Sequence, residues 1–182
     1  MHGLPRSTPS LQLRHFVQDD ALEAMALNAE PSTRHWLPSH VYATADEAQS
    51  RLKYLISSYQ EPGNPRLGPY VLAVAEARTA RLLGHVGFSP FDDEVEVSYA
   101  IAESARGRGY GVESLACACD WIAGTFPVSR VLAITAVENL PSRRVLEHAS
   151  FAHVRDEDLL FQGVRRAVSR YCWTAPAQCN GS

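Results

Sequence analysis

The sequence feature that most constrains this chain is the glycine-rich segment Ala105-Arg-Gly-Arg-Gly-Tyr-Gly111. It lies between a strand-like run at 94–101 and a helical pattern at 112–124. Its three glycines stand at alternate positions, so backbone N–H groups can approach a ligand without interference from a Cβ atom. The start of the helix adds unpaired N–H groups and a partial positive charge, and two arginines add full charges. The segment predicts a phosphate or pyrophosphate site; the plainer alternative is a turn with solvated arginines.

Two common phosphate-binding loops do not match this segment. A P-loop requires a lysine followed by serine or threonine where the helix begins, and no lysine is present here. A dinucleotide-binding fingerprint requires a third glycine three positions after the second. In the two possible registers that position holds Val112 or Ser114. The antiparallel pattern of the preceding strands is also the wrong setting for a Rossmann half.

Hydrophobic periodicity predicts a strand at 11–17 and two helices in the first third of the chain. The first helix is expected to begin after Asp20 and to end at Pro31. Thr44 and Glu47 have the spacing of a capping box and predict the start of the second helix. The apolar stripe of that helix is formed by Ala48, Leu52, Leu55 and Tyr59.

The remaining elements complete a mixed α/β layered fold. Three strand-like runs joined by short polar connections predict an antiparallel meander. They are followed by two helices and three further strands, giving the order β-α-α-β-β-β-α-β-α-β-β. The ranges are 70–76, 82–88 and 94–101 for the meander, then helix 112–124, strand 130–137, helix 141–149 and strands 151–155 and 167–173.

Composition indicates one globular domain. The chain has 182 residues, of which 46% are apolar, and a formal charge of −3, so it lacks the basic footprint of a nucleic-acid-binding protein. No apolar run is long enough for a membrane span, no secretory signal is present, and the cysteine spacing is not that of a metal site. We therefore expect a cytoplasmic protein with reduced thiols and no bound metal. The domain is expected at 11–174, with flexible ends at 1–10 and 175–182.

The motif Arg106-x-x-Gly109-x-Gly111, between a mid-chain strand and a helix, resembles the acetyl-CoA signature of the GNAT acetyltransferases. The resemblance extends over residues 10–174 and includes Gly84-His-Val-Gly87 and the strand at 95–101. Asn139-Leu-Pro-Ser142 is similar to the version carried by the subgroup that acetylates N-terminal amines of ribosomal proteins. The family fold implies a mostly antiparallel twisted sheet of about seven strands, flanked by about four helices, with two central strands that splay apart.

The resemblance also implies where acetyl-CoA would bind. The pantetheine arm would lie between the splayed strands, and the pyrophosphate would lie against the glycine-rich segment. Asn139 would contact the cofactor near its reactive half, although the residue is equally suited to cap the following helix. The implied cofactor-binding residues are Tyr99, Ala100, Ile101, Arg106, Gly107, Arg108, Gly109, Tyr110, Gly111, Val112 and Asn139.

Two positions depart from the family pattern. Many members have a tyrosine as general acid where this chain has Leu146, and a glycine where it has Ser150. Transfer of an acetyl group to an amine also requires a base for the ammonium proton. Glu96 is the candidate base, and Ser142 is the candidate for contacting the thiol or positioning water. The alternatives are a solvent-facing glutamate and a serine that caps the helix.

The sequence thus favours an acetyl-CoA-dependent N-acetyltransferase that acts directly on a primary amine, with a protein or peptide N-terminus as the preferred acceptor. A small amine, amino acid or antibiotic is the alternative acceptor, and a catalytically silent acyl-CoA-binding module is the alternative of another class. His35 and His40 flank Trp36-Leu-Pro38 in a region that covers the acceptor site in the family. No nucleic-acid or membrane partner is expected, and a homodimer is compatible with the resemblance.

Overall fold

The computed structural model describes residues 3–60 and 63–176. These residues form five α-helices and eight strands, with single 3₁₀ turns at Gln18–Asp20, Pro38–His40 and Glu103–Ala105. The elements are β1 (Arg6–Ser7), β2 (Leu11–Arg14), α1 (Ala21–Asn28), α2 (Pro31–Trp36), α3 (Ala45–Gln60), β3 (Tyr70–Glu76), β4 (Leu82–Phe91), β5 (Glu94–Ile101), α4 (Tyr110–Thr125), β6 (Arg130–Ala136), α5 (Leu140–His148), β7 (Ala152–Phe161) and β8 (Val164–Thr174).

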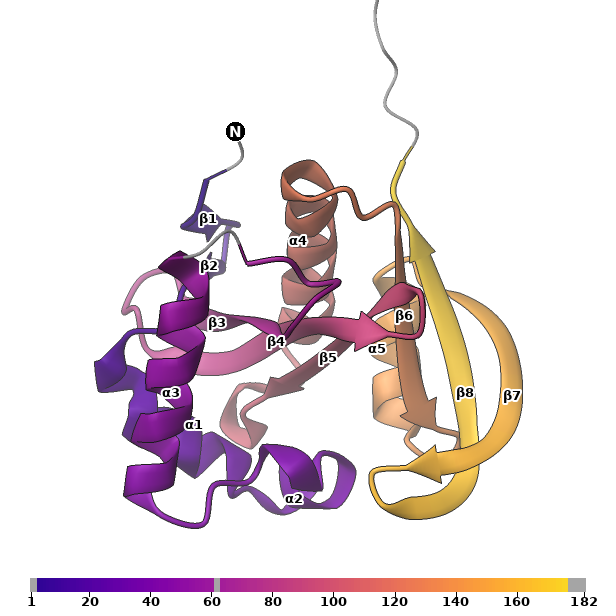
Figure 1. Cartoon of the computed structure of the whole chain (residues 1–182), viewed down its shortest axis with the longest axis horizontal. Coiled ribbons are helices and arrows are strands. Elements are labelled where there is room, and N and C mark those ends of the chain that lie inside the picture. The colour runs from indigo at the N-terminus through magenta and orange to yellow at the C-terminus, as the bar shows by residue number, and fades with distance from the viewer. Residues whose placement is uncertain (1–2, 61–62, 177–182) are drawn as a thin grey trace, which may run out of the picture.

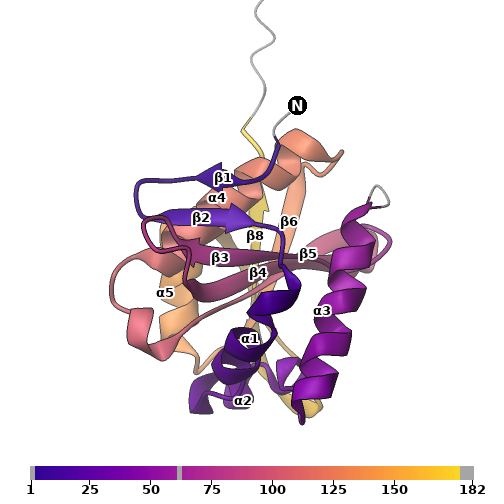
Figure 2. The same cartoon turned by 90° about the vertical axis from the view of Figure 1, so that its left-hand side faces the viewer.

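All eight strands form one sheet in the order β1-β2-β3-β4-β5-β6-β8-β7. Every neighbouring pair is antiparallel except β5 and β6, which are parallel. Helices α1 and α3 lie on one side of the sheet, and α4 and α5 lie on the other (Figures 1 and 2). The predicted mixed α/β fold and its antiparallel β3-β4-β5 meander are confirmed.

Two apolar clusters hold the helices to the sheet. The larger cluster packs α4, through residues such as Leu115 and Ile122, against strand residues such as Phe88 and Val95. The smaller cluster packs α1 and α3 against the opposite face. Leu52, from the predicted stripe of α3, is fully buried there. The capping box is partly confirmed, because the Glu47 backbone N–H donates to Thr44 Oγ1 at 3.2 Å while its side chain accepts from the backbone N–H of Ala43.

Three boundaries differ from the sequence prediction. The first helix ends before Pro31, as predicted, but Pro31 then occupies the first turn of an additional helix, α2, where its missing N–H costs no hydrogen bond. Strands β7 and β8 are longer than expected because Gln162 and Gly163, both with positive φ, form a tight hairpin turn. The strand Arg6–Ser7 pairs with β2, so the expectation of a flexible segment over 1–10 is corrected for these two residues.

Residues 177–182, which make up most of the expected flexible C-terminal tail and include Cys179, lie outside the described residues. Cys117, Cys119 and Cys172 are free thiols. Within residues 3–60 and 63–176, none of the helices combines the length and apolar character of a bilayer span.

Candidate active site

A gap in the middle of the sheet forms the largest cleft described here. The parallel strands β5 and β6 pair only where they begin, through Val95 with Val131 and Glu96 with Leu132, and then diverge. The divergence opens a cleft of about 750 Å³, which is floored by β5 and β6 and bordered by the glycine-rich segment, α2 and α5. Figure 1 shows β5 and β6 separating beneath α4. The cleft is within the size range of small-molecule and cofactor sites.

The glycine-rich segment closes one end of this cleft with free backbone donors. Gly107 and Gly109 adopt φ values of +75° and +79°, in the left-handed region that favours glycine. The first hydrogen bond of α4 runs from the N–H of Glu113 to the C=O of Gly109. The backbone N–H groups of residues 107–112 have no acceptor among the described residues. A row of free amides at a helix N-terminus is suited to bind a phosphate or pyrophosphate group.

The two arginines of the segment have different surroundings. Arg106 Nε donates to the carbonyl oxygen of Ile101 at 2.8 Å, and its guanidinium lies 3.7 Å from Glu30 and 3.8 Å from Glu103. Arg106 thus ties the loop to the end of β5 and to the segment before α2. Arg108 is exposed beside the free amides. Its contact with a pyrophosphate stays a prediction, as does that of Arg106.

The backbone of β5 presents further free groups to the cleft. Successive residues of a strand direct their backbone groups alternately to its two neighbours. Ala102 N–H donates to the Leu83 carbonyl of β4 at 2.8 Å, so Ala100 also faces β4, opposite His85. Tyr99 and Ile101 accordingly direct their backbone groups toward the cleft. Of the three residues expected to pair with pantetheine amides, these two have the appropriate orientation.

Side chains from β5, α4 and α5 meet at one wall of the cleft. The hydroxyl groups of Tyr99 and Ser142 are 3.0 Å apart, and burial raises the pKa of Tyr99 to about 12. Ser142 lies in the first turn of α5, where its backbone N–H donates to Asn139 Oδ1 at 3.3 Å. Asn139 therefore caps α5, as its alternative role predicts, and also lines the cleft. A Cβ on Gly111 would lie 3.3 Å from Val145 Cγ1, so glycine permits this close approach of α4 and α5.

Glu96 lies on the opposite face of β5 from Tyr99 and also lines the cleft. Burial raises the pKa of its carboxyl group from an ordinary 4.5 to about 7, and the positive charge of Arg170 opposes part of this rise. Glu96 is half-buried, so its role as the base stays a prediction. A carboxyl group that titrates near neutrality is suited to general acid–base chemistry.

Leu146, at the position where many relatives have tyrosine, is 1% exposed and presents an apolar side chain to the cleft. The hydroxyl group nearest in role is that of Tyr99, whose side chain the sequence reasoning did not single out. In the sequence, Tyr99 alternates with Val97 and Ile101 along a strand, and this pattern indicates only a core position. Ser150, where relatives have glycine, adopts a φ of +66° after α5, so the glycine-like turn is retained.

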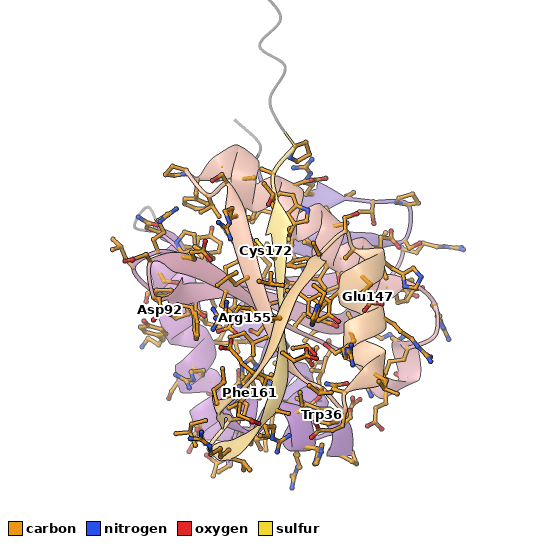
Figure 3. All side chains as sticks on the ribbon, turned by 90° about the vertical axis from the view of Figure 1, so that its right-hand side faces the viewer. Trp36, Asp92, Glu147, Arg155, Phe161 and Cys172 are labelled. Atoms are coloured by element: carbon orange, nitrogen blue, oxygen red, sulfur yellow. The ribbon has the colours of Figure 1, made fainter. Side chains whose placement is uncertain are left out.

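The tip of the β7–β8 hairpin and the helix α2 also border the cleft. Ser39 Oγ and Gln162 Oε1 form a hydrogen bond of 3.0 Å, and the Arg166 guanidinium lies 5.8 Å from the centroid of the Trp36 ring. Figure 3 shows Trp36 and Phe161 near the same end of the molecule. Sequence reasoning placed Trp36 near the acceptor site but missed the hairpin tip, because the hairpin was expected to be shorter.

The cleft has the features that coenzyme A requires. The free amides at residues 107–112 suit its pyrophosphate, and the unpaired edge of β5 suits the amides of its pantetheine arm. The family profile described as "Acetyltransferase (GNAT) domain" matches residues 10–152. This chain belongs to the GNAT acetyltransferase family. It is an acetyl-CoA-dependent N-acetyltransferase. In the described part of the chain, no cluster of three or more potential metal ligands is present.

Solved structures share this fold at low sequence identity. The ribosomal-protein-S5-alanine acetyltransferase of Vibrio fischeri has a TM-score of 0.79 and 17% identity, over 94% of this chain and 97% of that one. The Salmonella typhimurium acetyltransferase that modifies the N-terminal serine of ribosomal protein L7/L12 has a TM-score of 0.75 and 17% identity, over 93% and 97%. Mycobacterium smegmatis RimJ, in complex with CoA-disulfide, has a TM-score of 0.74 and 19% identity, over 94% and 85%. No curated protein matches the chain.

Proposed function

We propose that this GNAT acetyltransferase acetylates the α-amino group at the N-terminus of a protein or peptide. The observation that carries the proposal is the Glu96 carboxyl group in the cleft, whose pKa is about 7. An α-ammonium group has a pKa of about 8, so moving its proton to Glu96 costs about 1–2 kcal/mol. A lysine ammonium group has a pKa near 10.4, and the same transfer costs about 4–5 kcal/mol. Glu96 is therefore matched to an α-amine.

Acetyl-CoA, when bound, supplies the thioester whose acetyl carbon the neutral amine attacks. The residues of this chain prepare that encounter. The free amides at 107–112 hold the pyrophosphate, with Arg108 beside them, and the backbone of Tyr99 and Ile101 aligns the pantetheine arm along β5. Glu96, on the face of β5 opposite to Tyr99, takes the proton of the ammonium group. These contacts position the reactants and expose the lone pair of the amine.

The second proton requirement is at the sulfur atom that leaves as the carbon–sulfur bond breaks. Ser142 and Tyr99 are the hydroxyl groups suited to this role. When Tyr99 donates its hydrogen bond to Ser142 Oγ, the Ser142 proton is free to be directed into the cleft. Ser142 then donates a hydrogen bond to the sulfur, which stabilises its developing negative charge. Leu146, at the position where many relatives have tyrosine, has no hydrogen-bond donor in its side chain.

The structural relatives support an N-terminal acceptor. The Salmonella typhimurium protein is described as modifying the N-terminal serine of ribosomal protein L7/L12, and the Vibrio fischeri protein is named a ribosomal-protein-S5-alanine acetyltransferase. Both match over more than nine-tenths of this chain.

The proposal is tested with recombinant protein, acetyl-CoA and matched acceptors. The panel contains peptides with a free N-terminus and no lysine, the same peptides with a blocked N-terminus and an internal lysine, and small amines that include amino acids and aminoglycosides. We expect kcat/KM to be at least 100-fold higher for the free N-terminus than for the internal lysine. Faster turnover of a small amine would refute a peptide acceptor. Binding of CoA without thiol release from any acceptor would identify a silent module.

A further inference from the structure

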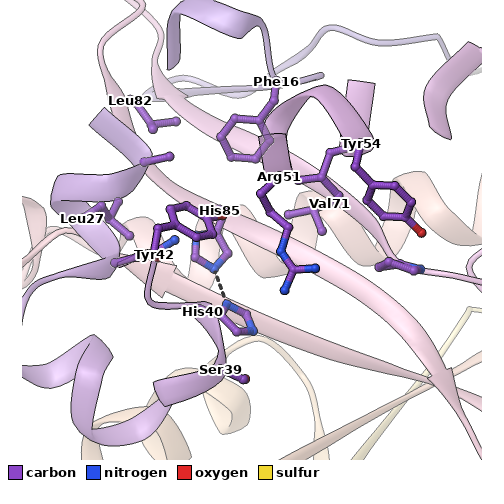
Figure 4. Close-up of a pocket in the computed structure, with 14 residues that line it drawn as sticks. Phe16, Leu27, Ser39, His40, Tyr42, Arg51, Tyr54, Val71, Leu82 and His85 are labelled. Atoms are coloured by element: carbon purple, nitrogen blue, oxygen red, sulfur yellow. Dashed lines mark hydrogen bonds between the residues drawn. The ribbon is translucent and has the colours of Figure 1, made fainter. Parts of the chain in front are cut away.

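A second cavity, of about 260 Å³, lies beside the catalytic cleft. It is enclosed by α1, α3 and the strands β3 and β4 (Figure 4), and we call it the side pocket. Its walls include Phe16, Leu27, Tyr42, Leu55, Val71 and His85. Ser39 and His40 line both the side pocket and the cleft, so the two spaces adjoin. A volume below that of ordinary ligand sites suits one part of a larger molecule held in the cleft.

Two histidines present hydrogen-bonding groups to the side pocket. His40 Nδ1 and His85 Nε2 are 3.1 Å apart, and His85 is 6% exposed. Burial lowers the pKa of His85 to about 3, and burial together with the charge of Arg51 lowers that of His40, so both rings are neutral near pH 7. One N–H group is shared between the rings. The outer nitrogens of the pair therefore offer one donor and one acceptor.

Two further polar residues, Asn28 and Arg51, border the side pocket. Asn28 is 2% exposed, its Oδ1 atom is covered by neighbouring atoms, and its side chain lies against that of Tyr42. Arg51 is an exposed residue whose guanidinium points into the space beside the two histidines (Figure 4), and no carboxylate of the described residues lies within ion-pairing distance of it. Arg51 therefore disfavours a second positive charge in the same space.

We infer that the side pocket binds one side chain of the acceptor peptide, an aromatic or aliphatic one, and rejects lysine and arginine. The apolar walls surround the side chain, while Arg51 repels a cation. The inference rests on the proposed peptide acceptor and names the specificity of that site.

The strand register indicates which residue of the peptide reaches the side pocket. Glu96 and Ala100 are on the same face of β5, four residues and about 13 Å apart. His85 pairs with Ala100, so the side pocket begins about this distance from the base. An extended peptide advances at most about 3.6 Å per residue. With its amine at Glu96, the side chain of the third or fourth residue enters the side pocket.

Hexapeptides that differ only at the third or the fourth position test this assignment. The variable residue is Tyr, Leu, Gly or Lys, and KM and kcat are measured with saturating acetyl-CoA. At one of the two positions, we expect KM to be at least 10-fold lower for Tyr and Leu than for Gly, and highest for Lys. We expect kcat to stay within about twofold, because the pocket contributes binding away from the reacting atoms. Equal KM values across both series would overturn the inference.

Two charge-removing variants on α3 provide a matched comparison. Arg51→Gln should lower the KM of the Lys peptide at least fivefold relative to the unaltered protein. Lys53→Gln removes the same charge from an exposed position on the same helix that does not line the pocket, and should leave the KM series unchanged. The same improvement in both variants would assign the discrimination to net charge and overturn the role of Arg51 in the side pocket.

Binding of N-acetylated hexapeptides to the CoA-saturated protein separates this inference from the proposed function. Fluorescence anisotropy should give a higher affinity for the Tyr and Leu peptides than for the Gly peptide, and the lowest affinity for the Lys peptide. If that order holds and no free peptide is acetylated, the side pocket is supported and the peptide acceptor of the reaction is refuted. If the peptides are acetylated and neither affinity nor KM depends on the variable residue, the reaction is supported and the side pocket is refuted.

Discussion

Replacing Glu96 with glutamine should make this protein more stable and less active, and both effects follow from the buried carboxyl group. Burial raises the pKa of Glu96 from 4.5 to about 7. The difference corresponds to about 3 kcal/mol of unfavourable free energy for the ionised form in the folded protein. Glutamine has nearly the same shape and no charge to bury. The substitution therefore removes this penalty while it removes the base.

The stability difference depends on pH in a defined direction. Below pH 4.5 the carboxyl group is protonated in the folded and unfolded states, so the protein and the Glu96→Gln variant should be equally stable. As the pH rises to about 7, the unfolded chain releases a proton that the folded protein retains, and the stability of the unaltered protein falls. At pH 8 the variant should be more stable by about 1–3 kcal/mol, measured by urea unfolding.

The kinetic effect has the opposite sign. A positioned base contributes about 10²–10⁴-fold, so kcat/KM of Glu96→Gln should fall by at least about 100-fold with CoA affinity unchanged. The rate of the unaltered protein should rise with pH through about 7 as Glu96 ionises. The variant should lack this rise and recover partly at high pH, where the amine is already neutral. Glu94→Gln is the matched control, because Glu94 is on the same strand but pairs with Arg130 at 3.3 Å.

Two results would refute this reasoning. Full activity of Glu96→Gln with an unchanged pH profile would show that the carboxyl group is not the base. Equal stability of the variant and the unaltered protein at pH 8 would show that the carboxylate is solvated in the fold. A loss of activity shared by Glu94→Gln would indicate a general effect of charge on the strand.

Three further outcomes follow from the geometry of the loop and of α5. Gly109→Val should abolish CoA binding measured by calorimetry, because φ is +79° at Gly109 and a residue with a Cβ atom is strained there. Gly111→Ala should weaken binding less, because its Cβ atom would press on Val145 of α5. Unchanged CoA affinity in both variants would show that the loop is not part of the site. Ser142→Ala should lower kcat while CoA affinity is kept, with Tyr99→Phe giving a smaller loss, whereas a lower melting temperature with normal kcat would leave Ser142 a capping role alone. Ser150→Gly should raise the free energy of unfolding by about 1 kcal/mol, because a residue with a Cβ atom is strained at a φ of +66°, and no gain by urea unfolding would show that the turn is relaxed.

Local chemistry made the centre of the fold predictable from the sequence. The glycines of the loop and the apolar face of α4 act within a few residues of one another, so spacing alone predicted a phosphate site at 105–111. The antiparallel meander followed from alternating strands joined by short connections. Asn139 and Pro141 mark the start of α5 through preferences of the first helical turn.

The boundaries that the sequence misplaced depend on tertiary contacts. The first helix ends before Pro31, and Pro31 lies in the first turn of α2, a six-residue helix too short to show a hydrophobic period in the sequence. The outer half of the β7–β8 hairpin has charged and exposed side chains, and its strand structure comes from pairing across Gln162-Gly163 rather than from an apolar pattern. The short strand Arg6–Ser7 exists because β2 offers it an unpaired edge.

The chain's sequence therefore determined the conformation of the glycine-rich loop and the order of the helices and strands, because those depend on residues that are neighbours along the chain. Only the tertiary structure decided the chemistry around the loop. It set where β5 and β6 part, brought Tyr99 of β5 within 3.0 Å of Ser142 of α5, and gave Glu96 its pKa of about 7. The side pocket likewise joins His40 to His85, 45 residues apart. Segments that are far apart in the sequence come together, and water is excluded from the groups between them, only when the chain is packed. A local pattern of residues therefore does not show these contacts.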